Sequence, residues 1–533
     1  MLKSVLEVKK ELVSVKVSEE HLTSILAYLG MLLDRLAGFG NSLSGWNYHE
    51  QAVANVFGRQ AIPMVWDFAE VSIAANMSGG VEGGLNRIVD AIEYLNSIEN
   101  PAFVTRGTAL ETGLDGQTID AIVTDPPYYD NVPYADISDF FYVWLKRVLA
   151  DRHGEHFASE LTPKKTEAIA DPSRHHGSKE RARKFYEQIM EKAFTEASRV
   201  LKQTGEMIVV YAHKTTVGWA TLVDALRSSG FSITEAWPLD TEYSGRLRKQ
   251  NSAALASSIF LVARKRRGSV SGSYEDAVRP ELEQIVRERV DSLWKMGING
   301  ADLVIAAVGA GLRPFTRFGQ VEYANGEDVP SARFLVEVEG VVLETLLEKI
   351  FGLTRSGVAA VDGPCRFYVL WRYTYKAAEM DSGEVIVFTY GQNVELDGRN
   401  GLSSGNRALV EKKKGKCRLR DFTERGDNPK LGIPKDDGTP ATLIDALHRI
   451  LWLMENQPRN LNRFLDEARP DMERLRLVAQ ALAGTALSGK KEDLPEHSVT
   501  TTAAEQAALK KLVANWRSLI DQRAKDKHEA LFD

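Results

Sequence analysis

Cysteine is almost absent from this sequence. Only Cys365 and Cys417 occur among the 533 residues, and they stand far apart in the chain. Two isolated cysteines exclude a zinc ribbon and argue against a disulfide framework. A reducing cytoplasm is therefore the predicted location of the chain.

Long apolar runs are also missing. No run approaches the roughly 18 residues of a membrane span, and the N-terminal segment MLKSVLEVKKELVSVKV has no signal-peptide core. We therefore expect no membrane contact. There is no internal repeat. The chain is long, with 44% hydrophobic residues and a formal charge of −6, which predicts about two to four domains with large buried cores.

Three regions differ in their residue patterns. Residues 1–100 predict helices, because apolar residues recur at helical spacing along the segment 19–39. Residues 101–268 alternate strands with helices, which predicts a doubly wound, Rossmann-like α/β sheet. Residues 269–533 predict a mainly helical α+β domain that binds DNA or a partner. The predicted strands of the middle region lie at 102–105, 119–124, 206–213, 231–239 and 257–264.

Two details of the middle region refine the predicted sheet. The strand at 119–124 is apolar enough for the interior of a parallel sheet. The last two strands follow each other without a helix between them. We therefore expect them to form a hairpin at one edge of the sheet.

The segment TDPPYYDNVPYADISDFFYVWLKR begins at the end of the strand 119–124. Ligands of open parallel sheets lie beyond the carboxyl ends of the strands, where Asp125 is expected. Pro126 and Pro127 lack N–H groups and have a fixed φ, which leaves their carbonyl groups free and rigidly aimed. Tyr128 supplies a flat face on which a ring can stack. The alternative is that the prolines merely end a strand and Tyr128 packs in the core.

A carboxylate beside aimed carbonyls forms a site made of acceptors alone. Such a site suits a planar –NH2 group, because it holds both protons and leaves the nitrogen lone pair pointing away. The exocyclic amine of a nucleobase is such a group, and the base must leave its stack to enter. With a methyl donor in line, the site promotes attack by nitrogen through positioning and electrostatics. The position of the motif, at a strand end and before an aromatic helix, favours this function over the structural alternative.

The whole segment closely resembles the catalytic segment of the large bacterial and archaeal adenine-specific DNA methylases, a family that often carries a zinc ribbon and occurs in phage-defence loci. The stretches NVFGRQAIPMVWDFAEV and IVVYAHKTTVGWATLVDAL also resemble this family, and the likeness covers most of residues 20–480. The resemblance implies a class I methyltransferase sheet, S-adenosyl-L-methionine as the methyl donor and DNA adenine as the target. It also implies a restriction–modification or antiviral defence setting, with other defence proteins as further partners. By the same resemblance, the amine-binding motif is Asp125, Pro126, Pro127 and Tyr128.

Other residues are candidates for contact with the donor or the DNA. The stretch FVTRGTAL resembles the third strand and turn of the family, which makes Gly107 and Thr108 candidate donor contacts together with Asp125. Thr108 stands where the family often has an acid. No metal site is predicted, because the pair of histidines at 175–176 has no acid or cysteine cluster nearby. The candidates for contact with the base or with phosphates are Tyr129, Asn131, Tyr134, His213, Arg246, Arg248 and Lys249.

A recognisable donor loop is missing. A methylase of this family needs a glycine loop of the Phe-x-Gly-x-Gly kind after its first strand and an acid after its second. LAGFGNSLSG follows a predicted helix, and AAVGAGLRPF belongs to the C-terminal region. The chain therefore resembles the C-terminal half of a methylase, with a sheet that lacks its first two strands.

Three explanations of the missing loop remain open: a partner polypeptide supplies it, the chain is an inactive relative kept for binding, or the donor pocket is of an unrecognised kind. We favour a partner, because a mere scaffold would have little need of the retained motif. The leading hypothesis is a DNA adenine methyltransferase that acts with this partner. The alternatives are a cytosine-amine methyltransferase, which would use the same motif, a non-catalytic DNA-binding subunit, and an RNA or protein amine methylase.

Overall fold

The structure is a computed structural model. It describes residues 1–48, 50–54, 56–57, 64–74, 79–98, 104, 106–127, 129, 132–211, 216–239, 258–268, 270–390, 392–398, 401–435, 440–484 and 502–518.

Contacts divide the chain into two compact units. The first unit holds residues 1–108 and 127–189, and the second holds residues 109–126 and 190–533. The chain thus enters the second unit for a short segment, returns to the first, and then crosses again. The three regions predicted from the sequence, with borders at residues 100 and 268, were defined by their type of secondary structure and not by contacts. That division into three regions stays a prediction.

Helices build most of the first unit. They are α1 (Leu2–Ser14), α2 (Glu19–Phe39), α3 (Val81–Asn96), α4 (Tyr134–Leu149) and the first half of α5 (Lys179–Val200), with the hairpin of β1 (Trp46–Asn47) and β2 (Ala52–Val53) and the short helix η1 (Pro172–His175). α2 covers the residues predicted to form an amphipathic helix. Ser18 caps it by accepting a hydrogen bond from the His21 N–H group.

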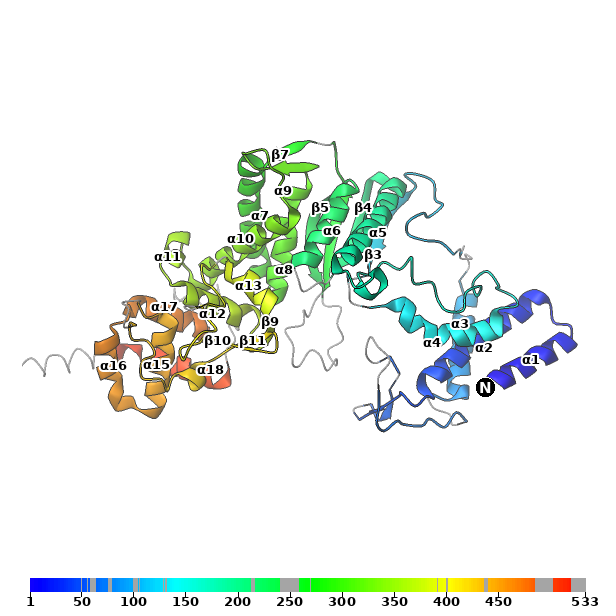
Figure 1. The fold of residues 1–533 in the computed structure, drawn as a ribbon, viewed down its shortest axis with the longest axis horizontal. Coiled ribbons are helices and arrows are strands. Elements are labelled where there is room, and N and C mark those ends of the chain that lie inside the picture. Colours follow the sequence, from blue (N-terminus) through cyan, green and yellow to red (C-terminus); the bar gives the residue numbers. More distant parts are fainter. Residues whose placement is uncertain are drawn as a thin grey trace, which may run out of the picture. The chain divides into compact units, whose positions relative to one another are not determined.

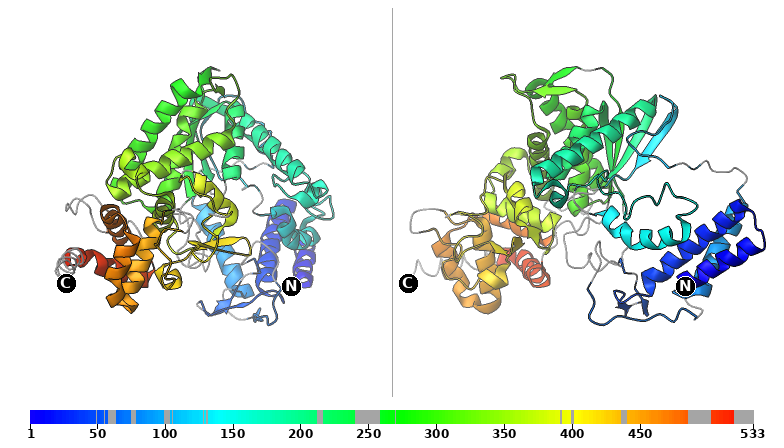
Figure 2. Two further views of the ribbon diagram at one scale, coloured as in Figure 1. Left: turned by 60° about the vertical axis from the view of Figure 1, so that its left-hand side comes forward. Right: turned by 45° about the vertical axis from the view of Figure 1, so that its right-hand side comes forward.

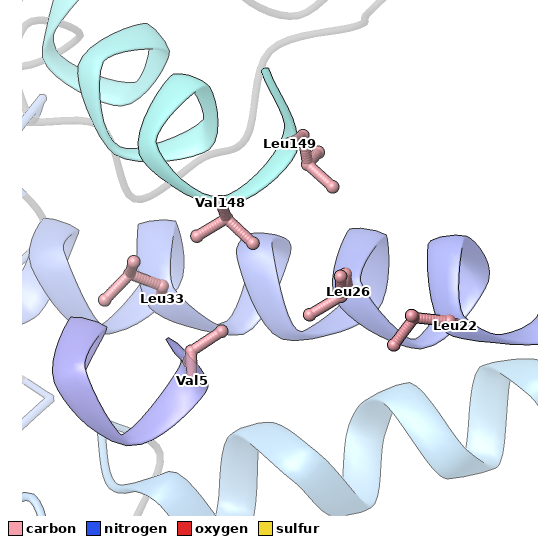
Figure 3. Packing of buried hydrophobic residues seen from close by; sticks show 6 residues of the cluster. All are labelled: Val5, Leu22, Leu26, Leu33, Val148 and Leu149. Atoms are coloured by element: carbon pink, nitrogen blue, oxygen red, sulfur yellow. The ribbon is translucent and has the colours of Figure 1, made fainter. Parts of the chain in front are cut away.

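The core of the first unit joins helices that are distant in sequence. Figure 3 shows its buried residues, which are Val5 of α1, Leu22, Leu26 and Leu33 of α2, and Val148 and Leu149 of α4. Burial of these apolar side chains is the main force that holds α4 in place. The C-terminal end of α4, the aromatic helix that follows the motif, is therefore held by the N-terminal helices.

α2 is long and apolar enough to cross a membrane by length and composition. The prediction that no segment is long and apolar enough to span a membrane is therefore wrong for α2. Its leucines pack against α1 and α4, which is how a core helix buries its apolar stripe. One such helix near the N-terminus is weak support for a membrane location.

A four-stranded mixed sheet organises the second unit (Figure 1). Its strands, in spatial order, are β3 (Ile119–Thr124), β4 (Leu201–Tyr211), β6 (Ser258–Lys265) and β5 (Phe231–Leu239). β3 and β4 are parallel, and β6 runs antiparallel between β4 and β5. α5 leads into β4, and α6 (Thr216–Ser228) connects β4 to β5.

The predicted α/β class and the predicted hairpin of the last two strands are confirmed, since β5 and β6 pair antiparallel. The strands predicted at 119–124 and 231–239 are β3 and β5, with the same bounds. The interior position predicted for 119–124 is wrong for the described sheet, because β3 is its edge strand, as Figure 2 also shows. The strand predicted at 102–105 lies outside the described residues except for Val104, which is not in a strand.

The rest of the second unit is mainly helical, as predicted. The helices are η3 (Tyr274–Val278), α7 (Arg279–Lys295), α8 (Gly300–Gly311), α9 (Arg313–Thr316), α10 (Ser331–Phe351), α11 (Arg355–Ala359), α12 (Gly363–Thr374), α13 (Ser382–Tyr390), α14 (Phe422–Arg425), α15 (Leu443–Asn456), η4 (Pro458–Asn460), α16 (Leu461–Ala468), α17 (Met472–Ala483) and α18 (Ala503–Ala514). The short strands are β7 (Ser271–Ser273), β8 (Gln320–Glu322), β9 (Met380–Asp381), β10 (Val410–Lys413) and β11 (Lys416–Leu419).

α8 packs directly on the sheet. A Cβ atom at Gly309 would lie 2.6 Å from the Cβ of Ala236 in β5 and 3.4 Å from Leu261 in β6. Only glycine allows the helix backbone to come this close. The region beyond residue 268 is therefore joined to the sheet by a tight contact.

Candidate active site

The carboxyl ends of three strands lie at the same end of the sheet. β3 and β4 are parallel, and β5 shares their direction because β4 and β5 are both antiparallel to β6. Asp125 follows β3 directly and is exposed, and the next residue, Pro126, is buried. Asp125 thus lies where ligands of α/β sheets bind, beyond the carboxyl end of its strand.

Tyr211 is the last residue of β4, at the same end of the sheet. It is a core residue. Its side chain is 1% exposed. Its hydroxyl donates a hydrogen bond of 3.0 Å to the Gly218 carbonyl, and its ring meets Trp219 edge-on at 5.4 Å. This side chain anchors the start of α6, so we assign it a structural role rather than a place in the pocket.

The border between the two compact units falls inside the motif. Asp125 and Pro126 belong to the second unit, whereas Pro127 and Tyr129 belong to the first. In the first unit, the Tyr186 hydroxyl donates a hydrogen bond of 2.7 Å to the Pro127 carbonyl. The expectation that both proline carbonyls are free is therefore corrected for Pro127. The Asp125 carboxylate and the Pro126 carbonyl remain as the candidate acceptors.

Tyr186, on α5, fixes the backbone after the second proline. Its phenol also hydrogen-bonds to the backbone of Tyr129, and the two rings meet edge-on at 5.5 Å. Tyr129 has a φ of 32°, a value that costs free energy outside glycine and is maintained by surrounding contacts. Its carbonyl accepts from the Ala170 N–H group at 2.8 Å. Burial raises the pKa of Tyr186 to about 12, so its phenol stays protonated and able to donate at neutral pH.

A polar network orders the long connection after α4. Arg174 pairs with Asp136 on α4 and with Glu167, the latter at 2.6 Å. Glu167 also accepts a hydrogen bond of 2.9 Å from the Ala135 N–H group in the first turn of α4. The first N–H groups of a helix lack partners within the helix, so Glu167 caps α4 from the connecting loop. This loop therefore holds the start of α4 in place.

The remaining candidate residues are distributed as follows. Gly107 and Thr108 are exposed residues of the first unit. Tyr134 begins α4 and is 60% exposed. The candidates that lie outside the described residues are Tyr128, Asn131, His213, Arg246, Arg248 and Lys249.

Two described candidates for donor contact, Gly107 and Thr108, do not fit a methyl-donor pocket. A donor that approaches the backbone closely requires glycine because a Cβ would be in the way. At Gly107 a Cβ would meet nothing within 4 Å, so nothing described there needs glycine. Thr108 is exposed, and as a threonine it supplies no carboxylate where the family often has an acid that contacts the adenine of the donor. We therefore derive no chemical step through S-adenosyl-L-methionine from these residues.

The basic run at 411–420 forms the hairpin of β10 and β11. Part of its charge is paired within the fold: Lys412 contacts Asp397 at 2.7 Å, and Arg418 contacts Glu424 at 2.6 Å. Lys413 and Lys414 are exposed at the turn. The hairpin therefore presents exposed lysines at its turn, whereas charges on its two strands are partly paired within the fold.

Sequence reasoning missed Tyr186 and Arg174. Tyr186 stands on the apolar stripe of a long helix, where a core residue is the usual interpretation. Arg174 stands in a polar loop, where a charge is usually solvated. No family model, curated protein or solved structure matches this chain.

Proposed function

We propose that this chain is the target-base half of an S-adenosyl-L-methionine-dependent DNA methyltransferase that acts on the exocyclic amine of adenine. It works in the cytoplasm, in DNA modification or phage defence, with a partner that binds the donor. The observation that carries the proposal is the placement of Asp125 and Pro126 beyond the carboxyl end of β3. The next carbonyl, of Pro127, is already held by Tyr186.

This placement suits an amine with two protons. The Asp125 carboxylate and the Pro126 carbonyl are acceptors on adjacent residues, and Pro126 has no N–H group that would repel an amine. Two hydrogen bonds to these acceptors orient the nitrogen and leave its lone pair directed away from them. An adenine reaches the site only after it has flipped out of the duplex.

The order of the strands also supports the proposal. The last strand in sequence, β6, lies antiparallel between two strands that are parallel to each other. The closing part of a class I methyltransferase sheet has this arrangement. Such agreement of fold is an analogy, so the argument from Asp125 remains the stronger one.

Donor binding tests the enzymatic part of the proposal. Labelled S-adenosyl-L-methionine is titrated into the full chain alone and into the chain mixed with the protein encoded next to it. We expect binding only in the mixture, because Gly107 and Thr108, two of the described candidates for donor contact, do not fit the donor. Absence of donor binding in both samples contradicts the proposal.

Substitution of Asp125 tests the site. Asp125→Ala should abolish methyl transfer to DNA in the mixture and leave thermal unfolding of the chain unchanged, since the side chain is exposed. The matched control is Asp291→Ala, an acid on α7 that pairs with Lys349, and it should keep full transfer. Transfer by Asp125→Ala would show that the motif is wrongly assigned.

Product analysis separates the alternatives. Digestion of the methylated DNA to nucleosides should give 6-methyladenine, whereas 4-methylcytosine would assign the same site to cytosine. DNA binding without transfer, in a mixture that does bind the donor, would identify a non-catalytic DNA-binding subunit.

A further inference from the structure

The two faces of the sheet differ in burial. On β4 and β6, alternate residues point to opposite faces. One face, which we call the covered face, carries Met207, Val209, Tyr211, Ile259, Leu261 and Ala263, all between 0% and 1% exposed. The other, which we call the open face, carries Ile208, Val210, Phe260 and Val262, all partly exposed.

The open face continues onto β3. Val123 lies beside Ile208 in the parallel register and is 66% exposed. At the opposite end of the sheet the open face becomes polar, where Glu206 pairs with Arg264, with side chains 43% and 50% exposed. The apolar part of this face therefore lies toward the end of the sheet where β3 finishes and Asp125 follows. A parallel sheet normally has both faces covered, whereas the described residues cover this apolar part only partly.

The two edges of the sheet differ as well. At β5, the Ile233 N–H group donates a hydrogen bond of 2.9 Å to the Thr316 hydroxyl, and the Arg289 guanidinium donates to the Ala236 carbonyl. Side chains from α9 and α7 thus occupy backbone groups of that edge. At β3, β4 is the only strand that pairs with it in the described part of the chain. Among the described residues, β3 is therefore the edge that suits a further strand.

The connections between the strands show on which side of the sheet crossover helices lie. The connections β3–α5–β4 and β4–α6–β5 step across the sheet in the same direction. Connections between parallel strands are almost always right-handed, so α5 and α6 lie on the same side, as Figure 1 shows. By the same rule, crossover helices lie on the opposite side when parallel strands are added outward from β3, because those connections step across the sheet in the other direction.

We propose that the β3 edge and the apolar part of the open face form the docking surface for a separate polypeptide, which adds a parallel strand to β3 and covers the face with a helix. This inference rests on the proposed function for the identity of the partner, which is the protein that binds the donor. The order of strands would then reverse at β3, and ligands of doubly wound sheets bind at such a point. The partner would thus bring the donor beside Asp125.

A second copy of this chain fits the surface less well. Two β3 edges related by a two-fold axis would pair antiparallel and complete both edges. They would bring no helix to the open face of either copy, and Val123, Ile208 and Val210 would keep their exposure. A polypeptide with a strand followed by a helix satisfies both observations.

Site-specific cross-linking tests the docking surface. A photo-cross-linker is attached at Val123→Cys or, as a matched control, at Val270→Cys, since these two valines are 66% and 63% exposed. The native thiols Cys365 and Cys417 are buried and do not compete for the label. The probe is a protein encoded next to this chain, chosen because its sequence has a glycine loop between a strand and a helix. We expect it to be labelled from position 123 and not from position 270.

A charge at the same position gives a second measurement. Val123→Asp should weaken binding of the neighbouring protein about tenfold or more, because the carboxylate would be buried without a partner. Val270→Asp should leave binding unchanged, and both variants should unfold at the temperature of the natural chain. Equal labelling from both positions, labelling of a second copy from position 123, or no labelling overturns the docking proposal.

Donor binding in the same mixture separates this inference from the proposed function. Donor binding and transfer that are insensitive to Val123→Asp would contradict the docking surface and leave the proposed function standing. Labelling from position 123 without donor binding would support the surface and contradict the function. Absence of both would contradict both.

Discussion

The two edges of the sheet are completed in different ways. At β5, the chain uses its own later helices, with the Thr316 hydroxyl bound to one backbone group and Arg289 bound to another. At β3, the only strand partner in the described chain is β4, and Val123 is mostly exposed. An edge strand with apolar exposure is a liability for a protein that stays alone, because it pairs readily with other chains. The β5 edge is thus a surface completed by the chain itself, and the β3 edge is the proposed interface.

The same contrast separates the two faces. The covered face excludes water almost completely, whereas apolar residues of the open face retain part of their contact with solvent. Apolar burial contributes about 25 cal/mol per Å², so equal residues on the two faces contribute unequally to stability. This inequality can be measured by changing neighbouring residues of one strand.

The largest effect is expected from a matched pair of truncations on β4. Val209 is 0% exposed, and Val210, on the other face, is partly exposed. Val209→Ala should lower the free energy of unfolding by about 2–3 kcal/mol, because it removes buried methyl groups and leaves a cavity. Val210→Ala should lower it by about 1 kcal/mol or less. Chemical denaturation measures both losses, and equal losses would contradict the distinction between the faces.

The same two substitutions can be compared for their effect on binding of the proposed partner. If a helix covers the open face in the complex, Val210 becomes buried there. Val210→Ala should then weaken the complex, whereas Val209→Ala should affect mainly the folding of the free chain. A binding affinity unchanged by Val210→Ala would remove this residue from the docking surface.

A smaller effect is expected at the edges. Thr316 is buried, and Thr316→Val keeps its shape while removing the acceptor for the Ile233 N–H group. We expect a loss of about 1–2 kcal/mol, because a buried donor is left without a partner. The reverse change at the other edge, Val123→Thr, should change stability by about 0.5 kcal/mol or less. A large loss for Val123→Thr would show that the β3 edge is packed in the free chain.

The sequence predicted the elements of the sheet better than their exposure. Apolar alternation and length identified β3 and β5 within their observed bounds, because strand formation depends on local pattern. Along β4 the pattern does not distinguish the two faces, since Ile208 and Val210 are as apolar as Met207 and Val209. Whether a second layer covers a face depends on which other segments reach it, and no local pattern contains that information.

The candidate site shows a similar limit. Asp125 was predicted beyond a strand end because motif and strand are adjacent in sequence. Tyr186 acts on Pro127 across 59 positions, and a tyrosine on an apolar helix stripe looks like any core residue. The ordering of the loop by Arg174, which pairs with Asp136 and Glu167, likewise joins residues whose pairing the sequence does not reveal.

The smallest expected effect concerns how β3 is held. Glu196, on the second half of α5, accepts hydrogen bonds from the Thr112 N–H group at 2.8 Å and the Thr112 hydroxyl at 2.6 Å. Arg199 of the same helix pairs with Glu196 and donates to the Leu114 carbonyl at 2.7 Å. The segment that enters β3 is thus fastened by polar contacts, whereas the β5 edge is also packed against α8.

These polar contacts make the β3 edge sensitive to acid. Hydrogen bonds from Arg199 and Thr112 hold the pKa of Glu196 well below its ordinary value. A carboxylate with a lowered pKa in the folded state stabilises the fold above its unfolded pKa and loses that contribution as the pH falls through the folded pKa. Glu196→Gln should therefore speed hydrogen exchange of residues 112–124 at neutral pH, and the natural chain should lose the same protection in strong acid. The matched control is Glu180→Gln on the same helix, which loses only an exposed pair with Lys184 and should leave that exchange unchanged. Faster exchange of β5 in Glu196→Gln would show that the two edges are not held independently.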